Sequence, residues 1–232
     1  DGRLLRVGEA VVRFYVLQND GIYQSEAEVP VKDGKKMTVN GVEMKAGDPK
    51  WVDRNGDNKI TDEDKVLKGH SLPKYTGGFS TQLKFIRFDL GASFFFAAGQ
   101  SAMNYRAYQQ YDFTTLDKGD NLAGEKEIFF WQSGNVPMDY PRYNALSEVH
   151  PYRADQDLYL EKVSYLKLRS VTLGYSVPTP KHDVFVYESG INLFTVSKFS
   201  GDDPELVDFD GYYRGYGMGI PRSVTLGVRC SF

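Results

Sequence analysis

Residues 223–232 read Ser-Val-Thr-Leu-Gly-Val-Arg-Cys-Ser-Phe, and apolar and polar side chains alternate through them without a break. A period of two residues predicts a β-strand with one apolar face and one polar face. The apolar face holds Val224, Leu226, Val228, Cys230 and Phe232. Because chain ends usually fray, an alternation that continues to the last residue predicts that these residues are paired in a sheet.

A second alternating segment precedes it at residues 78–98. Phe79, Thr81, Leu83 and Phe85 alternate with polar residues, a short turn follows at Ile86-Arg87, and apolar residues alternate again from Phe88 to Phe96. Two such runs joined by two residues predict an antiparallel hairpin.

Three more segments have the same period. Residues 171–177 alternate before Pro178-Thr-Pro180, and Leu166 and Leu168 lie on the opposite phase, which predicts a β-bulge near Arg169-Ser170. Residues 184–198 form a further expected strand, and residues 10–24 form the weakest of the six.

The connections between these six strands alternate between long and short. They measure about 50, 2, 60, 6 and 20 residues in chain order, the rhythm of a transmembrane β-barrel with long extracellular loops and short periplasmic turns. The long loops cover about residues 25–75, 98–160 and 200–221. Six strands are too few for a closed bacterial barrel, so we expect the C-terminal part of a larger one. A soluble antiparallel sandwich remains the alternative on pattern alone.

The composition excludes several other classes. A net charge of −3 gives no basic surface for nucleic acid, and one cysteine excludes a disulfide scaffold. Apolar content of 41% argues against disorder, and no apolar run approaches the ~18 residues of a transmembrane helix. The opening Asp1-Gly2-Arg3 carries no initiator Met and no signal peptide, which fits a piece of a longer protein.

Residues 53–64 have the spacing of a twelve-residue calcium loop. Its expected ligand positions are Asp53, Asn55, Asp57, Lys59 through its carbonyl, Thr61 and Asp64. Two departures are Asn58 in place of the usual Gly and Asp64 in place of the longer Glu. We predict a structural calcium ion that stabilises a long loop, against the alternative of an acidic turn held by its own hydrogen bonds.

No catalytic set is evident, so an enzyme is not expected. The three histidines, His70, His150 and His182, are far apart in polar or proline-rich contexts, and Cys230 lies on an apolar strand face. Aromatic residues between the strands are candidates for contact with a substrate or a partner. These are Tyr105, Tyr108, Tyr111, Trp131, Tyr140, Tyr212, Tyr213 and Tyr216.

Several stretches resemble SusC/RagA-type TonB-dependent transporters of the Bacteroidetes. They are the acidic segment 47–64, Leu72-Pro-Lys-Tyr-Thr-Gly-Gly-Phe79, and the strand patterns at 165–175, 192–205 and 220–232. They follow the family's order along nearly the whole chain, although residues 100–155 match nothing in it.

The resemblance implies an all-β fold, namely the last six antiparallel strands of a barrel of about 22 strands. It implies import of oligosaccharides or peptides across the outer membrane, with no plug domain or TonB box in this chain. A SusD-like surface lipoprotein and TonB are the expected partners, TonB acting through a missing N-terminal part. Phe232 resembles the signal by which barrel-assembly machinery recognises a last strand.

Two rival functions stay open. One is a soluble calcium-dependent carbohydrate-binding β-sandwich module. The other is a receptor for iron chelates in the same broad transporter class, which would need no lipoprotein partner.

Overall fold

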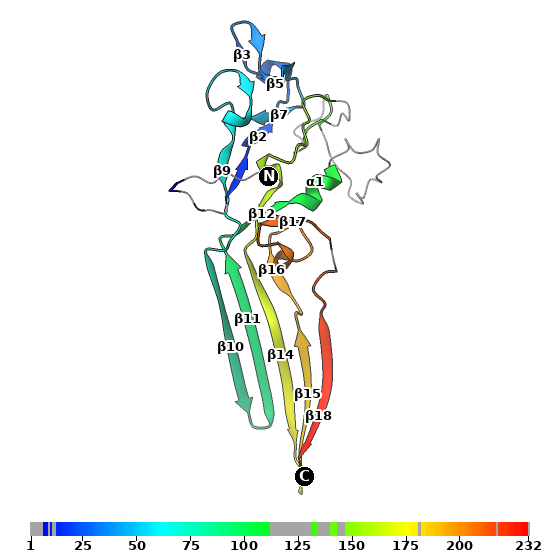
Figure 1. The fold of residues 1–232 in the computed structure, drawn as a ribbon. Helices are drawn as coiled ribbons and strands as arrows, with labels where there is room; N and C mark the ends of the chain where they lie inside the picture. Colours follow the sequence, from blue (N-terminus) through cyan, green and yellow to red (C-terminus); the bar gives the residue numbers. More distant parts are fainter. Residues whose placement is uncertain are drawn as a thin grey trace. The chain divides into compact units, whose positions relative to one another are not determined.

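A computed structural model describes residues 7–8, 10, 13–111, 131–133, 140–142, 147–180, 182–216 and 218–231, with the side chains of residues 110 and 111 left out. The chain divides into two compact units. One comprises Asp1–Gly69 and Met103–Leu160 and is called the small-strand unit; the other comprises His70–Ala102 and Glu161–Phe232 and is called the long-strand unit. Figure 1 labels strands of both units.

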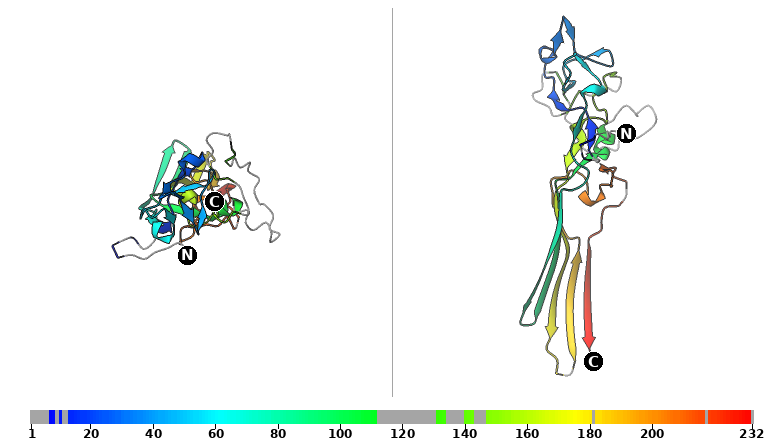
Figure 2. Two further views of the ribbon diagram at one scale, coloured as in Figure 1. Left: turned by 90° about the horizontal axis from the view of Figure 1, so that it is seen from above. Right: turned by 60° about the vertical axis from the view of Figure 1, so that its left-hand side comes forward.

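The long-strand unit is built on one antiparallel sheet. Its strand order is β10-β11-β14-β15-β18, and β16 pairs with β14 off this path. Figure 1 and the right-hand view of Figure 2 draw it as a layer of long strands. The strands are β10 (Tyr75–Phe85), β11 (Phe88–Ala98), β14 (Tyr165–Val177), β15 (Asp183–Ile191), β16 (Thr195–Ser197) and β18 (Ser223–Ser231).

The predicted hairpin and bulge are confirmed. Strand β10 ends at Phe85 and β11 begins at Phe88, with Ile86 at a φ of 56° in the turn. Ser93 pairs with Ser170 whereas Phe94 pairs with Leu168, so Arg169 is the extra residue of β14. The bulge returns Leu166 and Leu168 to the apolar face, which explains their phase in the sequence.

Two expectations for the strands were wrong. The run 184–198 is divided into β15 and β16, because Asn192 adopts a φ of 54° and ends the first strand. The described residues of the range 10–24 supply no strand to the large sheet. They form β1 (Phe14–Val16) and β2 (Asn19–Ile22) in the small-strand unit. Gly21, with a φ of 106°, interrupts the side-chain alternation of this segment. The sixth strand of the large sheet is instead β16.

The small-strand unit consists of short ladders. Strand β1 pairs with β9 (Val66–Lys68) and β2 with β7 (Pro49–Trp51). Two tight hairpins follow, β3 (Val31–Lys32) with β4 (Lys35–Lys36) and β5 (Thr38–Val39) with β6 (Val42–Glu43). Their turn residues, Asp33-Gly34 and Asn40-Gly41, all have positive φ, as a two-residue type I′ turn requires. Strand β8 (Lys59–Ile60) pairs parallel with β5.

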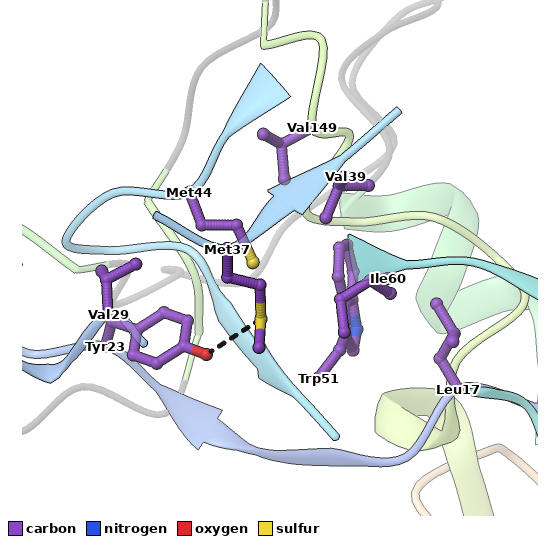
Figure 3. Close-up of a cluster of buried hydrophobic side chains, with 9 residues drawn as sticks. All are labelled: Leu17, Tyr23, Val29, Met37, Val39, Met44, Trp51, Ile60 and Val149. Carbon is purple, nitrogen blue, oxygen red and sulfur yellow. Dashed lines mark hydrogen bonds between the residues drawn. The ribbon is translucent and has the colours of Figure 1, made fainter. Parts of the chain in front are cut away.

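A core of nine buried side chains holds these ladders together (Figure 3). Trp51 is 2% exposed, and its indole Nε1 donates to Gln156 Oε1 at 2.9 Å. The Gln156 amide nitrogen donates to the carbonyls of Pro151 and Arg153, so this buried amide joins two chain segments. The core residues are Leu17, Tyr23, Val29, Met37, Val39, Met44, Trp51, Ile60 and Val149.

The remaining elements are short. A three-stranded sheet has the order β13 (Leu160–Lys162), β12 (Ser101–Asn104), β17 (Tyr212–Tyr213). One α-helix, α1 (Tyr105–Tyr111), is described, with the 3-10 turns η1 (Glu26–Glu28), η2 (Asp62–Asp64), η4 (Asp157–Tyr159) and η5 (Pro204–Leu206). Within the described ranges no helix has the length and apolar character needed to cross a membrane. The all-β fold class is confirmed.

Candidate functional site

The large sheet separates apolar from polar side chains by register. Residues opposite each other on neighbouring strands share a face, so each register row can be followed across the sheet. One row runs Leu83, Leu90, Leu173, Glu188, Leu226, and the next runs Phe85, Phe88, Tyr175, Val186, Val228. Leu226 is 79% exposed and Leu83 58%. This face therefore presents a broad apolar surface that nothing in the described chain covers.

The rows that alternate with these apolar rows, on the opposite face, are polar. One runs Gln82, Gly91, Thr172, Ser189, Thr225, with the hydroxyls of Thr172 and Ser189 3.1 Å apart. On the same face, Phe185 and Tyr187 stack at 6.0 Å between ring centroids, and the Arg229 guanidinium lies 5.1 Å from the Phe185 ring. The sheet can therefore act as a wall between an apolar and an aqueous phase.

Both edges of this wall are open. Strands β10 and β18 each have one neighbour in the described sheet, so each leaves a row of backbone N–H and C=O groups without a strand partner there. In an apolar phase each such group would cost several kcal/mol. Further strands are therefore needed before the sheet can stand in lipid.

The predicted calcium loop folds through its own side chains. Asp53 accepts hydrogen bonds from the backbone N–H of Gly56 at 2.7 Å and of Asn58 at 2.8 Å. Asn55 accepts from Asp57 N, and Asp57 from Lys59 N, both at 2.9 Å. Asn58 has a φ of 65°, the left-handed conformation needed where calcium loops usually carry Gly.

Asp64 closes the loop. It is fully buried, and its two oxygens accept from Arg54 N at 2.9 Å and from Thr61 N at 2.8 Å. The latter bond belongs to the capping box of η2, in which Thr61 is the N-cap. The loop is thus ordered by hydrogen bonds to the same oxygens that a cation would use.

The fit to a metal is therefore partial. The oxygen donors are of the type that a hard cation takes. Within the described ranges, however, no group of three or more Asp, Glu, His or Cys side chains is gathered to hold a metal ion. The calcium ion stays a prediction.

The hairpin β3–β4 lies against this loop. The Lys32 ammonium donates to the carbonyl of Gly56, and Asn58 Nδ2 donates to the Lys35 carbonyl at 3.0 Å. Thr38 N also donates to the Asn58 carbonyl at 3.1 Å. Movement of the loop would therefore disturb the neighbouring hairpins.

Burial and charge shift two groups near the loop. Burial, together with the charges of Asp48 and Asp53, raises the pKa of Tyr23 to about 12. Burial alone would raise the pKa of Asp155, but hydrogen bonds and charges from Arg153 and Lys65 outweigh it and hold that pKa below its ordinary value. The Lys65 ammonium lies 2.7 Å from both Asp155 and Asp62.

The predicted aromatic contacts are divided between the two units. In the small-strand unit, Tyr105 packs against Tyr108 at 5.1 Å, and Tyr108 packs edge-on against Tyr159 at 5.7 Å. Trp131 N donates to the Tyr140 carbonyl at 3.0 Å. These rings pack against their own unit. The side chain of Tyr111, and Phe232, lie outside the described residues.

In the long-strand unit the structure brings Tyr212, Tyr213 and Tyr216 together. They line a cavity of about 180 Å³ with Leu206, Asp208, Arg214 and Gly215. Tyr213 is 1% exposed and packs edge-on against Phe199 at 5.0 Å, so it is a buried part of the cavity lining. Sequence reasoning missed Asp208 and Arg214, although both lie within four residues of Tyr212 and could have been included with it.

An ionic network that the sequence did not predict fixes the segment before this cavity. The Lys167 ammonium, 1% exposed, lies 2.7 Å from both Asp203 and Glu205. Arg169 donates to both oxygens of Glu205 at 2.5 and 3.0 Å. Lys167 and Arg169 belong to β14, and Glu205 belongs to η5, so the network fastens η5 to the sheet.

Comparison with known proteins gives two relatives in sequence. The chain is 29% identical over 211 residues to TonB-dependent receptor P3 of Formosa agariphila, covering 88% of this chain and 19% of the receptor. It is 28% identical over 244 residues to TonB-dependent receptor P26 of the same organism, covering 98% and 23%. The chain thus spans about a fifth of the length of the curated relatives it matches. No family model matches it.

Solved structures agree in fold. A chain of the RagAB peptide transporter superposes with a TM-score of 0.66 at 20% identity, covering 95% of this chain and 23% of that one. The closed-closed state of the RagAB peptide importer gives 0.62 at 21% identity, with 94% and 23% covered. The resemblance to SusC/RagA-type TonB-dependent transporters is confirmed, and these relatives are receptors and transporters rather than enzymes, as expected.

Proposed function

We propose, from its similarity in sequence to TonB-dependent receptors and in fold to RagAB chains, that this chain is part of the wall and extracellular loops of an outer-membrane importer. The observation that carries the proposal is the large sheet, whose opposite faces are apolar and polar and whose two edges are open. Lipid would cover the apolar face, and the polar face would line a lumen filled by water and substrate.

The charge distribution of the sheet supports this orientation. Lys84, Asp89 and Arg229 all lie on the polar face. The exception in the apolar rows is Glu188, which lies between Leu173 and Leu226. An acidic side chain costs less on a lipid face than Arg or Lys does, so one such residue is compatible with a membrane wall.

The cargo is an oligosaccharide or a peptide, and the partners are a SusD-like surface lipoprotein and TonB. The RagAB structures are named as a peptide transporter and importer, which supports import of a small polymer by a related fold. The lipoprotein would cover the extracellular loops. TonB would act on parts of the receptor that this chain does not contain.

The loop at 53–64 would bind a calcium ion with a structural role. The ion would take oxygens of Asp53, Asn55 and Asp57 with the Lys59 carbonyl, and Thr61 and Asp64 would complete the set. It would add to the hydrogen bonds already made by the same residues and hold the neighbouring hairpins.

Fractionation of the native source and the intact mass of the protein that carries this chain test the proposal. We expect an outer-membrane protein that requires detergent, is several times longer than 232 residues and co-purifies with a lipoprotein. A soluble 26.3 kDa species would overturn the proposal and favour the calcium-dependent carbohydrate-binding module. An outer-membrane receptor without a lipoprotein would favour the iron-chelate receptor.

A further inference from the structure

The cavity beside β17, here called the tyrosine recess, has the features of a ligand subsite. Tyr212 and Tyr216 present aromatic rings, and Tyr216 is 72% exposed. The volume of about 180 Å³ is smaller than the roughly 300–1,000 Å³ of pockets that enclose a whole drug-sized ligand. The recess therefore suits a single ring-sized group of a longer ligand.

The recess is held in shape before any ligand arrives. Asp208 and Tyr212 close a tight turn, with Asp208 N donating to the Tyr212 carbonyl at 3.0 Å and Tyr212 N donating to Asp208 Oδ1 at 2.7 Å. Tyr213 is fixed by Asp202, whose Oδ2 accepts from its hydroxyl at 2.9 Å. Lys167 and Arg169 of β14 also fasten η5, which precedes the recess residues in sequence, to the sheet. A preorganised site loses less conformational entropy on binding.

Arg214, which lines the recess, supplies hydrogen-bond donors. Its Nε lies 3.4 Å from Asp208 Oδ2, and its guanidinium lies 5.5 Å from the Tyr212 ring centroid. In the described part of the chain these are its side-chain contacts, so its two terminal nitrogens remain able to donate. The Arg214 and Asp208 side chains are 53% and 39% exposed. Together they offer donors and acceptors beside two ring faces.

The same bonds count against a peptide that would bind by adding a strand at Tyr212. A peptide that adds to a strand pairs with backbone N–H and C=O groups of that strand. At Tyr212 both groups are already bonded to Asp208. A sugar ring needs no strand edge, because its C–H face packs on an aromatic ring and its hydroxyls both donate and accept.

We propose that the tyrosine recess binds one sugar residue of an imported oligosaccharide. Tyr212 and Tyr216 stack on the sugar face, Arg214 donates to its hydroxyls, and Asp208 orients Arg214 and accepts from a neighbouring hydroxyl. The proposal rests on the importer function proposed above and assigns its cargo to the oligosaccharide class.

The experiment uses the full-length receptor purified from the outer membrane with its partners. Two probes are applied, an array of neutral oligosaccharides of four to eight residues and a mixture of random decapeptides. We expect the wild type to bind members of the array, and Tyr216→Ala and Arg214→Ala to raise Kd about tenfold each. Tyr212→Phe keeps the ring and should keep most of the affinity, whereas Tyr212→Ala should not. Phe209→Ala is the matched control, since Phe209 is 76% exposed and does not line the recess.

The outcomes separate the two proposals. Oligosaccharide binding that none of the recess substitutions weakens would overturn the subsite and leave the importer function intact. Binding of decapeptides alone would overturn the sugar assignment and leave a peptide importer. A receptor that binds neither probe and shows no TonB-dependent uptake of either would overturn the importer function and the subsite together.

Discussion

Tyr187 of β15 covers Gly227 of β18, so that a Cβ atom placed on Gly227 would come within 2.3 Å of the Tyr187 ring. The two residues are register partners on the polar face of the sheet. A glycine at this position lets the aromatic ring lie flat across the neighbouring strand. This pair joins the predicted last strand to the rest of the wall.

Replacing Gly227 with Val should therefore destabilise the wall. The new side chain would displace Tyr187, and overpacking of this kind typically costs about 1–3 kcal/mol. We expect a smaller fraction of the full-length receptor to reach the folded form, measured by heat-dependent migration in SDS gels. Gly91→Ala is the control, because nothing lies within 4 Å of the position its Cβ would take. Equal folding of both variants would contradict the role of the Tyr187–Gly227 contact.

Replacing Leu226 with Arg should impair membrane assembly. A charged Arg on a lipid face costs about 2–4 kcal/mol near the bilayer midplane. Thr225→Arg places the same charge one residue away on the polar face and should assemble normally. Outer-membrane yield of the two variants gives the comparison, and normal yield of Leu226→Arg would show that this face does not meet lipid.

Replacing Glu188 with Leu should impair neither membrane assembly nor stability. The carboxylate lies in an apolar row between Leu173 and Leu226, so its removal should leave assembly unchanged or raise it slightly. The measurement is the midpoint of urea unfolding in lipid vesicles. A clear loss of stability would show that Glu188 has a polar partner outside this chain.

Replacing both Asp53 and Asp57 with Ala should remove the bound calcium and loosen the loop. The double variant removes two expected ligands and the acceptors for three backbone N–H groups. We expect loss of one equivalent of calcium by elemental analysis and faster proteolysis between residues 45 and 70. Faster proteolysis without a change in calcium would assign the loop to hydrogen bonding alone.

The pKa of Asp155 predicts how the small-strand unit responds to acid. Its folded pKa is lowered, so its contribution to stability is fully present above the ordinary carboxyl pKa of about 3.9 and is lost as the pH falls through the lower folded value. Asp155→Asn should cost about 1.5–3 kcal/mol at neutral pH, the usual value for hydrogen bonds to a charged group. Thermal melts should show this difference shrinking only below pH 4, and a constant difference would contradict the ion pair.

Replacing Lys167 with Met should release the segment around η5. Asp203 and Glu205 would lose a buried partner, a loss that typically costs about 3–5 kcal/mol. Limited proteolysis should then cut between residues 199 and 216 while the wall remains folded. Lys198→Met removes a neighbouring exposed lysine and should leave the segment protected.

The strand pattern alone was enough to predict much of the large sheet. Apolar and polar residues alternate over long segments of this sheet. That alternation predicted the hairpin at Ile86, the bulge near Arg169 and the apolar face that ends in Val228 and Cys230. The same method failed for residues 10–24, which form the short strands β1 and β2 and not a long strand of the large sheet. Only pairing partners distinguish a short ladder from a long one, and those partners are distant in sequence.

The loop at 53–64 was visible in the sequence because its ligands and turns depend on local spacing. Its second role was not visible: Asn58 and Gly56 also bond the hairpin of Lys32 and Lys35, more than twenty residues earlier. The tyrosine recess differs, because its lining comes from one local segment, Leu206–Tyr216. Their aromatic rings made Tyr212 and Tyr216 candidates from the sequence, whereas the charged residues Asp208 and Arg214 were not among the candidates.

The sequence by itself determined the class of fold and the face of each long strand, because side-chain alternation in a strand is a local property with a fixed period. Tertiary structure decided which strands pair and that Lys167 lies beside Asp203 and Glu205. These contacts join residues far apart along the chain, and their geometry is set by packing and charge pairing that no local pattern encodes.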